Sequence, residues 1–299
     1  MANVLILLTL PEPIRNQYRD RLRNRFPGIT IELVDHHSKV GPYIGKADAL
    51  ITFAPMLSSE VLAAATRLKW VQALGTGVDN LIDQPALRQD VIVTNMRGIH
   101  GAPVSEAALA GMLALARGLR RAILAQDERQ WRRFPAQLLH DKTVGIFGVG
   151  QIAEILAPKC KAFGMRVVGA RKLAGFDRMH RREELARVIG DFDFLILLTP
   201  LTTATRNSID AKIFAAMKPT SYLINLARGG VVDEAAVIEA LAKGALLGRR
   251  LTYSTRSRCR PIIHSGRCPM SSSPHIRAGS AMSTSIMPCP RSRQTWSAF

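Results

Sequence analysis

Short apolar runs and amphipathic stretches alternate along most of this chain. In the first hundred residues the apolar runs have the length of strands, and they lie at residues 4–9, 29–34, 49–53, 70–73 and 91–94. Apolar positions at helical spacing fall between them, for example at residues 13–25 and 58–65. Such alternation is typical of a parallel sheet covered by helices on both faces.

The same rhythm continues after residue 140. Strand-length runs alternate with helical patterns, the strands at 144–147, 165–169, 192–198 and 221–225 and the helices at 151–163, 209–217 and 234–243. The sequence therefore predicts an α/β protein with two doubly wound parallel-sheet (Rossmann-like) domains, residues 1–100 and 101–248. An Ala-rich stretch with helical spacing predicts one long helix at 104–125 that joins them.

The composition excludes a membrane partner and a disulfide framework. Residues 4–10 are apolar, but no basic stretch precedes them and Pro11-Glu12-Pro13 follows at once, so we expect a first strand there rather than a signal peptide. No apolar stretch approaches the roughly 20 residues of a membrane span. Four cysteines without metal-like spacing indicate a reducing compartment. We therefore expect a cytoplasmic protein without a metal.

The net charge of +18 is unevenly distributed. Residues 249–299 hold nine Arg and no Lys, Asp or Glu, together with 11 Ser and three of the four Cys. The other 248 residues carry 32 basic and 23 acidic side chains, which is ordinary for a protein that binds anionic ligands. The tail has few aromatic residues and no helical Lys/Arg pattern, so specific nucleic-acid binding is not expected. We expect residues 249–299 to form an irregular, disordered tail.

The run at residues 142–153 carries the clearest chemical signal. A buried strand is expected to end at Phe147, and Gly148-Val149-Gly150 then leads into a helix that begins at Gln151. In a dinucleotide-binding turn the first glycine permits the tight turn, the second lets the backbone approach a pyrophosphate, and a small third residue, here Ala153, packs helix on strand. The unpaired amides from Gln151 onward lie at the positive end of the helix dipole. Such glycines are often just loop glycines, but their place between strand and helix favours cofactor binding.

The end of the next strand predicts the choice of cofactor. Residues 165–169 are followed by Ala170-Arg171-Lys172, where an NAD-binding protein places an acid against the ribose 2′-hydroxyl. A guanidinium suits a 2′-phosphate instead. Arg171 and Lys172 therefore predict NADP(H) in preference to NAD(H); a solvated basic turn is the alternative, and it fits Lys172 better than Arg171.

Arg228 is the candidate for binding the substrate. It follows the strand at 221–225, and ligands of open α/β sheets bind at the carboxyl ends of the strands. Gly229 and Gly230 turn the chain sharply after it, so its guanidinium can face a cleft, grip a carboxylate with two hydrogen bonds and polarise the adjacent carbonyl. The alternative is a structural ion pair with an acid near Asp79.

Four motifs together resemble those of the D-isomer-specific 2-hydroxyacid dehydrogenases. They lie at residues 75–80 (GTGVDN), 143–153 (TVGIFGVGQIA), 198–201 (LTPL) with Thr205, and 225–234 (NLARGGVVDE). The resemblance covers residues 1 to about 248. It implies a flavodoxin-like substrate domain at 1–100, a dinucleotide-binding domain after it, and a homodimer formed through the nucleotide domain. The activity it implies is hydride transfer between a nicotinamide cofactor and a small 2-hydroxy or 2-keto acid.

The resemblance also implies roles for single residues. Arg228 is the catalytic and substrate-binding arginine, and the backbone of Leu74 and Gly75 meets the substrate carboxylate. The residues implied to line the cofactor are Thr76, Ile152, Pro200, Thr205 and Ala227. Phosphoglycerate dehydrogenases look closest in the 75–80 loop but carry an Arg where this chain has Ala73. Glyoxylate or hydroxypyruvate is therefore favoured over a phosphorylated substrate.

The family's His–Glu pair is missing from this chain. A carboxylate beside the imidazole raises its pKa, so that the pair can move the proton that accompanies hydride transfer. The family places the Glu in an LDVFxxEP segment and the His in a PH segment, both after position 248, where this chain has no Glu. His275 follows a proline, as in the family's PH segment, but no Asp or Glu in residues 249–299 can be its acidic partner. His100 is either a substrate contact or a hinge residue, while His36 and His37 are expected in a surface loop.

The genetic code offers an explanation for the tail. When the last base of each codon is read with the first two bases of the next, from Leu251 to Ile276, codon degeneracy permits the string DVFDQEPLPADHPFWAMPNVIVTPH. This string is the missing family segment, with both the Glu-Pro and the Pro-His. The sequence thus predicts a shift of reading frame near Gly248 and a poor or inactive enzyme. The alternative function is a catalytically inactive NAD(P)-binding protein of the same fold.

Overall fold

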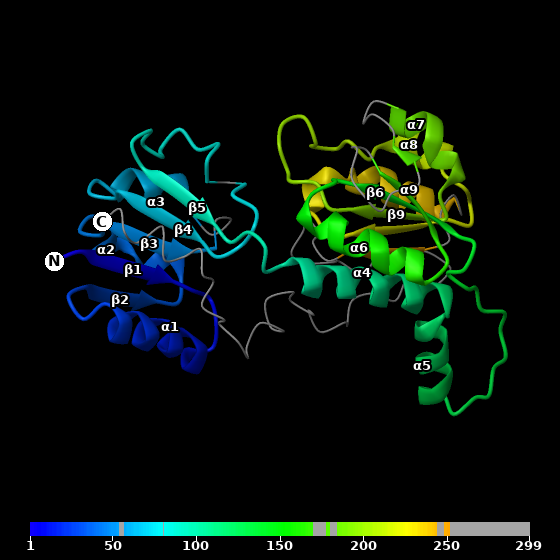
Figure 1. Cartoon of the computed structure of the whole chain (residues 1–299), viewed down its shortest axis with the longest axis horizontal. Helices are drawn as coiled ribbons and strands as arrows, with labels where there is room; N and C mark the ends of the chain where they lie inside the picture. The colour runs from blue at the N-terminus through cyan, green and yellow to red at the C-terminus, as the bar shows by residue number, and fades with distance from the viewer. Residues whose placement is uncertain (54–56, 80, 170–177, 180–183, 244–247, 252–299) are drawn as a thin grey trace. The chain divides into compact units, whose positions relative to one another are not determined.

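The computed structural model describes residues 1–251 apart from 54–56, 80, 170–177, 180–183 and 244–247 (Figure 1). The chain forms two compact units, the first of residues 1–100 and the second beginning at Gly101. Each unit is built on its own parallel sheet with helices between the strands. The predicted fold class, with two doubly wound α/β domains, is therefore confirmed.

The first unit has a five-stranded sheet in the order β2-β1-β3-β4-β5, with all neighbours parallel. The strands are β1 (Asn3–Leu7), β2 (Thr30–Val34), β3 (Ala49–Thr52), β4 (Trp70–Ala73) and β5 (Ile92–Asn95). The helices are α1 (Glu12–Arg25), α2 (Gly41–Ile44) and α3 (Ser59–Ala64), with a 3-10 turn η1 (His37–Lys39) before α2. The register aligns Leu5, Leu50 and Val71, which are buried in one core with residues of α2 and α3.

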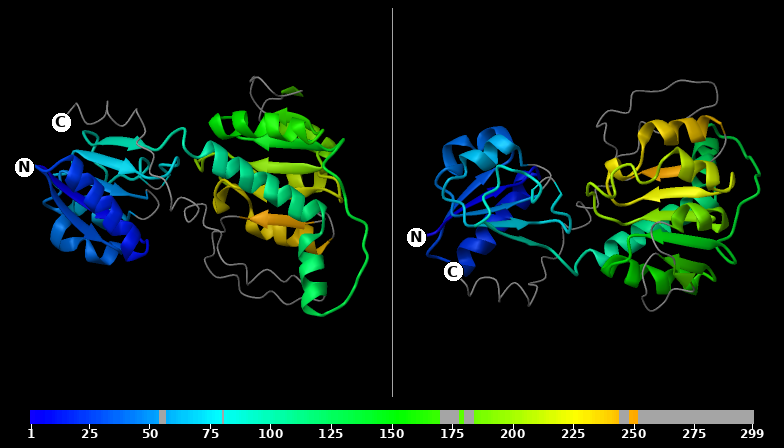
Figure 2. Two further views of the ribbon diagram at one scale, coloured as in Figure 1. Left: turned by 60° about the horizontal axis from the view of Figure 1, so that its bottom comes forward. Right: turned by 90° about the horizontal axis from the view of Figure 1, so that it is seen from above.

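The strand order of the first unit places helices on both faces of its sheet. The chain passes from β1 to β2 through α1 and then crosses back over β1 to β3 through α2. Because parallel crossovers are right-handed, connections that run in opposite directions along the sheet lie on opposite faces. Accordingly, α1 lies on one face, and α2 and α3 lie on the other (Figure 2).

The second unit has a six-stranded parallel sheet in the order β11-β10-β9-β6-β7-β8. Its strands are β6 (Thr143–Phe147), β7 (Arg166–Gly169), β8 (Arg178–Met179), β9 (Phe194–Leu197), β10 (Tyr222–Asn225) and β11 (Gly248–Leu251). Its helices are α4 (Gly101–Ala116), α5 (Leu119–Asp127), α6 (Gln151–Ala162), α7 (Leu185–Val188), α8 (Ala211–Ala216) and α9 (Glu234–Ala242). Two 3-10 turns, η4 (Ile189–Asp191) and η5 (Gly229–Val231), complete the described elements.

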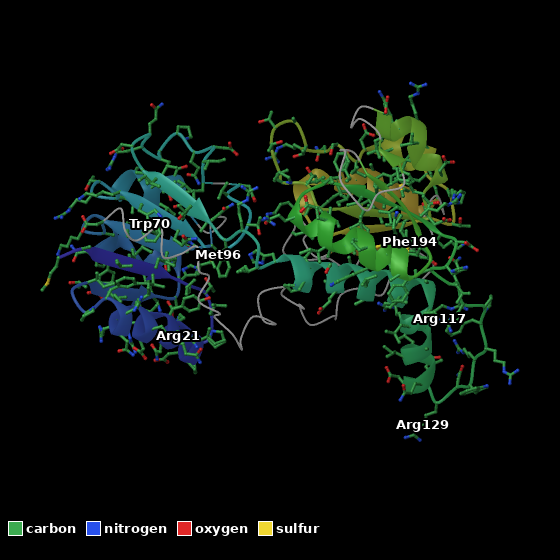
Figure 3. All side chains as sticks on the ribbon, viewed as in Figure 1. Arg21, Trp70, Met96, Arg117, Arg129 and Phe194 are labelled. Carbon is green, nitrogen blue, oxygen red and sulfur yellow. The ribbon has the colours of Figure 1, made fainter. Side chains whose placement is uncertain are left out.

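Alternate residues of the central strands face two separate cores in this unit. Phe194 and Ile196 of β9 pack with α4 and α6, while Leu195 and Leu197 pack with α8 and α9. These two pairs of helices cover opposite faces of the sheet (Figure 2). Phe194, which Figure 3 labels, is fully buried. Its ring stacks on that of Tyr222, with the ring centroids 5.2 Å apart. Burial on both faces explains why these strands read as continuous apolar runs in the sequence.

The expected continuous helix at 104–125 is wrong, because the structure divides it. The helix α4 ends at Ala116 and α5 begins at Leu119, with Gly118 between them in a left-handed conformation (φ 59°). A Cβ on Gly118 would lie 2.6 Å from the ring of Phe134, so a side chain there would meet both strain and a clash. Apolar spacing continues across this break and therefore did not reveal it. None of the helices in the described ranges is long and apolar enough to cross a membrane.

The expected start of the irregular tail at residue 249 is also wrong. Residues 249–251 belong to β11, which pairs in parallel with β10 from Tyr222↔Gly248 to Asn225↔Leu251. A strand ladder needs only backbone N–H and C=O groups, so a change of side-chain composition did not reveal this strand. The expected disorder of the rest of the tail, and His275 within it, lie outside the described residues.

Candidate nucleotide and substrate site

Gly148 forms the turn after β6 and lies against the backbone of the segment that follows the neighbouring strand β9. Its φ of 105° is a conformation that favours glycine. A Cβ at this position would lie 2.4 Å from the backbone nitrogen of Thr199 and 2.6 Å from the carbonyl carbon of Leu198. These atoms belong to backbone and cannot swing aside. Gly148 is therefore required both for the turn and for the close approach of the segment after β9.

Gly150 differs from Gly148 because its Cβ position is open. A Cβ there would meet no described atom within 4 Å. Gly150 is the N-cap of α6, Gln151 is exposed, Ile152 is half-buried, and Ala153 is fully buried against the sheet. The first amides of a helix have no partner within it and carry partial positive charge. The open position before these amides fits a phosphate group of a dinucleotide.

The segment after β9 is held by the side chain of Thr205. This threonine is 5% exposed, and its hydroxyl donates to the carbonyl of Pro200 at 2.7 Å while accepting from the amide of Thr202 at 2.7 Å. Pro200 itself is exposed. The structure therefore shows Thr205 closing the loop that presents Pro200.

Arg228 lies in the turn that follows β10. It is half-buried and extended (φ −138°, ψ 151°), it precedes η5, and its Nη1 donates to the carbonyl of Ala227 at 3.0 Å. Ala227 is 5% exposed. The amide of Asn207 donates to the carbonyl of Gly230 at 2.8 Å, so the segments after β9 and β10 are joined. Since β6, β9 and β10 are neighbours, their carboxyl ends place Gly148, Pro200 and Arg228 along one sheet edge.

The residues expected to bind substrate in the first unit follow β4. The amide of Leu74 donates to the carbonyl of Thr52 at 2.8 Å, and the carbonyl of Gly75 accepts from the amide of Met96 at 3.2 Å (Figure 3 labels Met96). The exposed Thr76 donates through Oγ1 to the carbonyl of Met96 at 3.2 Å. Ala73 is fully buried in the core of this unit. The loop at 74–76 is thus tied by its backbone to the end of β5.

The described histidines do not reproduce the family's proton-transfer pair. His36 accepts the amide of Ser38 in an exposed turn, as expected for a surface loop. His140 lies 3.5 Å from Asp141, but both are exposed and precede β6, at the amino edge of its sheet. Burial lowers the pKa of His100, because loss of water disfavours the imidazolium. No cluster suited to a metal ion occurs among the described residues.

Two of the expected site residues cannot be placed, and one residue of the site was not expected. Arg171 and Lys172, expected at the cofactor ribose, lie outside the described residues. Asn225, which we did not single out from the sequence, is fully buried beside Arg228 and bonds to its turn. An Asn at the end of an apolar run is a signal for such a local turn, because its side chain bonds to backbone two residues on.

Comparison with known proteins agrees with this geometry. Residues 109–251 match the family model described as "D-isomer specific 2-hydroxyacid dehydrogenase, NAD binding domain". The chain is 31% identical over 211 residues to a D-3-phosphoglycerate dehydrogenase of Methanocaldococcus jannaschii, covering 68% of this chain and 40% of that protein. It is 34% identical over 218 residues to a glyoxylate reductase of Thermococcus gammatolerans, covering 68% and 65%. The chain thus spans from less than half to about two thirds of the length of these relatives.

Solved structures show the same likeness over more of the chain. A D-isomer specific 2-hydroxyacid dehydrogenase family protein from Aeromonas salmonicida has a TM-score of 0.76 and 29% identity, covering 88% of this chain and 84% of that one. An NADPH-dependent glyoxylate/hydroxypyruvate reductase from Sinorhizobium meliloti, in complex with NADP and sulfate, has a TM-score of 0.74 and 26% identity, covering 88% and 84%.

Two parallel doubly wound sheets, with a glycine turn leading into a helix in the second, define a Rossmann-like α/β protein. The matched family model assigns that second unit to nicotinamide nucleotide binding. Residues 109–251 match the NAD-binding domain of the D-isomer specific 2-hydroxyacid dehydrogenases, and the chain is similar to members of that family over most of its length.

Proposed function

We propose that this chain is an NADP(H)-dependent oxidoreductase of small 2-keto and 2-hydroxy acids, in the glyoxylate or hydroxypyruvate class. When bound, the nicotinamide cofactor supplies the hydride. The proposal rests on a contrast between the two glycines of one turn. Backbone atoms fill the space where a Cβ of Gly148 would lie, whereas the space at Gly150, just before the first amides of α6, is open. Titration of nicotinamide fluorescence tests it, and failure to bind either cofactor would overturn it.

The preference for NADP(H) rests on the charge that follows β7. Arg171 and Lys172 stand in the sequence where an NAD-specific protein has an acid. The Sinorhizobium meliloti relative is an NADPH-dependent enzyme, which supports the proposal. Arg171 is proposed to bind the 2′-phosphate bidentately, with Lys172 adding a point charge.

Arg228 is proposed to bind the substrate. Its place after β10, at the edge that also carries Gly148 and Pro200, supports a role beside the cofactor. Its guanidinium would hold the substrate carboxylate and polarise the carbonyl that receives the hydride. The backbone of Leu74 and Gly75 is proposed to meet the substrate carboxylate, as the family resemblance implies. Thr76, Ile152, Pro200, Thr205 and Ala227 are proposed to line the cofactor on the same ground. The buried Ala73 offers no cation to a substrate phosphate, so an unphosphorylated acid is preferred.

A catalytically inactive NAD(P)-binding protein is the second candidate. The observation that favours it is the complete lack of Asp and Glu in residues 249–299, where the family keeps the acid of its proton-transfer pair. We propose that a shift of reading frame near Gly248 removed this acid. The nucleotide sequence around codon 248, together with glyoxylate and hydroxypyruvate assays with NADPH, separates the two candidates.

We further propose that the chain forms a homodimer through its second unit. The buried residue of α5 is Ala125, whereas Leu119 and Ile123, one turn apart, are 51% and 49% exposed, and Trp131 is 91% exposed. Arg117 and Arg129 flank α5, which points away from the sheet of this unit (Figure 3). Exposed apolar and aromatic side chains gathered on a helix and just after it are typical of an interface.

A reducing, cytoplasmic location completes the proposal. Cys160 is a free, buried thiol, and burial raises its pKa to about 12, so it stays protonated and unreactive. A free thiol of this kind suits a reducing compartment.

A further inference from the structure

The side-chain amide of Asn225 both donates and accepts a hydrogen bond within the turn that contains Arg228. It is the last residue of β10 and is fully buried. Its Nδ2 donates to the carbonyl of Arg228 at 2.9 Å, and its Oδ1 accepts from the amide of Ala227 at 2.9 Å. A buried amide whose donor and acceptor are both used has little freedom to move.

These two bonds fix the backbone on both sides of the Arg228 Cα. The amide of Ala227 lies one peptide before Arg228, and the carbonyl of Arg228 begins the next peptide. Upstream, the amide of Leu226 donates to the carbonyl of Leu197 at 3.1 Å, and downstream the amide of Val231 donates to the carbonyl of Arg228 at 3.2 Å. With the peptide planes held, the direction of the Arg228 Cα–Cβ bond is set, and its Nη1 reaches the carbonyl of Ala227.

We infer that Asn225 is a positioning residue that aims the Arg228 guanidinium for carboxylate binding without touching the substrate. The inference rests on the proposed function of Arg228. A substrate-binding group must be held closely, because a displacement of about 1 Å can lower a rate roughly 100-fold. Of the common side chains of this size, Asp keeps the acceptor for the Ala227 amide but loses the donor for the Arg228 carbonyl.

A purely structural role for Asn225 predicts loss of stability alone, and Ser221 provides the matched control. Ser221 directly precedes β10, at the opposite end of the strand, and is also fully buried. Its Oγ donates to the carbonyl of Lys218 at 2.6 Å. Ser221→Ala therefore removes a buried side-chain hydrogen bond next to β10, at the end of the strand that is remote from Arg228.

The experiment compares oxalate binding, as a stable mimic of glyoxylate, in the full chain and four variants: Arg228→Ala, Asn225→Asp, Asn225→Ala and Ser221→Ala. Calorimetry is run with NADPH saturating for each variant and at a temperature where circular dichroism shows each one folded. We expect Arg228→Ala to abolish binding, and both Asn225 variants to weaken it about tenfold or more. Ser221→Ala should stay within about twofold of the parent while its Tm falls.

The outcomes distinguish failure of the proposed role of Arg228 from failure of the positioning role of Asn225. Parental oxalate affinity in Arg228→Ala overturns the proposed role of Arg228 and this inference with it. Loss in Arg228→Ala with parental affinity in Asn225→Asp, which conserves the size of the side chain, overturns this inference alone. An equal loss of affinity in Ser221→Ala also overturns it, because general destabilisation would then explain the effect.

Discussion

The Cβ that Gly148 lacks would lie 2.4 Å from the backbone nitrogen of Thr199. This close approach joins the turn after β6 to the segment after β9, and the left-handed φ of Gly148 adds a second demand for glycine. Gly150, two residues on, has open space where its side chain would be. The two glycines of one turn therefore differ: Gly148 is required by packing, whereas Gly150 has open space that we propose a ligand phosphate occupies.

A paired substitution tests that difference. Gly148→Ala should lower the free energy of unfolding by about 1–3 kcal/mol or more, since the strained backbone and the clash with Thr199 add together. Gly150→Ala should cost less than about 1 kcal/mol as an N-cap change, yet weaken NADPH binding because a methyl group enters the phosphate position. Urea unfolding and fluorescence titration measure the two quantities. Equal stability losses in both variants would show that Gly150 is also a packing residue.

Arg171 should decide the cofactor. We expect tighter binding of NADPH than of NADH, and Arg171→Asp should reverse the order at a cost to NADPH of about 1–3 kcal/mol, as for a charge-assisted hydrogen bond. Titration of nicotinamide fluorescence with each cofactor gives both constants, with Arg166→Asp on β7 as a charge-matched control. Equal affinities in the parent chain would refute the predicted preference.

Arg228 should matter for substrate more than for cofactor. In a chain with the restored reading frame, Arg228→Ala should raise KM for glyoxylate and lower kcat, because both the carboxylate grip and the carbonyl polarisation are lost. Arg228→Lys should rescue little, since a point charge does not reproduce the planar fork. Near-parental kinetics in the alanine variant would leave Arg228 as a structural residue.

The chain as written should be a poor enzyme. Without the acid of the proton-transfer pair, it loses general acid–base catalysis worth about 10²–10⁴-fold. Reduction of glyoxylate and hydroxypyruvate with NADPH is measured for this chain beside a frame-restored one. Comparable rates would mean that residues after Leu251, His275 among them, supply the proton after all.

The surface of α5 should hold the dimer together. Ile123→Asp places a charge on the exposed apolar face of α5 and should shift the protein to monomer, because burying an unpaired carboxylate is unfavourable. Ile238→Asp on α9 is the control, since Ile238 is 39% exposed on another helix of the same unit. Sedimentation velocity reports the mass. A parent chain that sediments as a monomer would rule out the proposed interface.

The strands could be predicted from the sequence because both faces of each sheet are covered. Strands buried on both faces consist of uninterrupted apolar residues. The expected strand at 70–73 is β4, and the run at 221–225 contains β10 (Tyr222–Asn225). Boundaries moved by a residue or two, as for β1, expected at 4–9 and observed at Asn3–Leu7. Such shifts arise because pairing with neighbouring strands, rather than hydropathy, ends a strand.

The predictions from the sequence were wrong at two places where the local residue pattern does not reveal the path of the backbone. Apolar spacing runs on through Gly118, yet its left-handed backbone beside Phe134 divides α4 from α5. Residues 249–251 look like tail by composition, yet they pair with β10, because a ladder is made of backbone groups.

The order of the elements, the glycine turn before α6 and the place of Arg228 after a strand were determined by the sequence itself, because periodicity and turn chemistry are local. Only the tertiary structure decided that Gly148 abuts Thr199 and that the Asn225 amide spans the peptides around Arg228. The first is a contact between segments distant in sequence, and the second depends on where a particular turn places one donor and one acceptor. Neither the approach of Gly148 to Thr199 nor the hydrogen bonds of Asn225 can be predicted from hydrophobic spacing, because both depend on the path of the folded backbone.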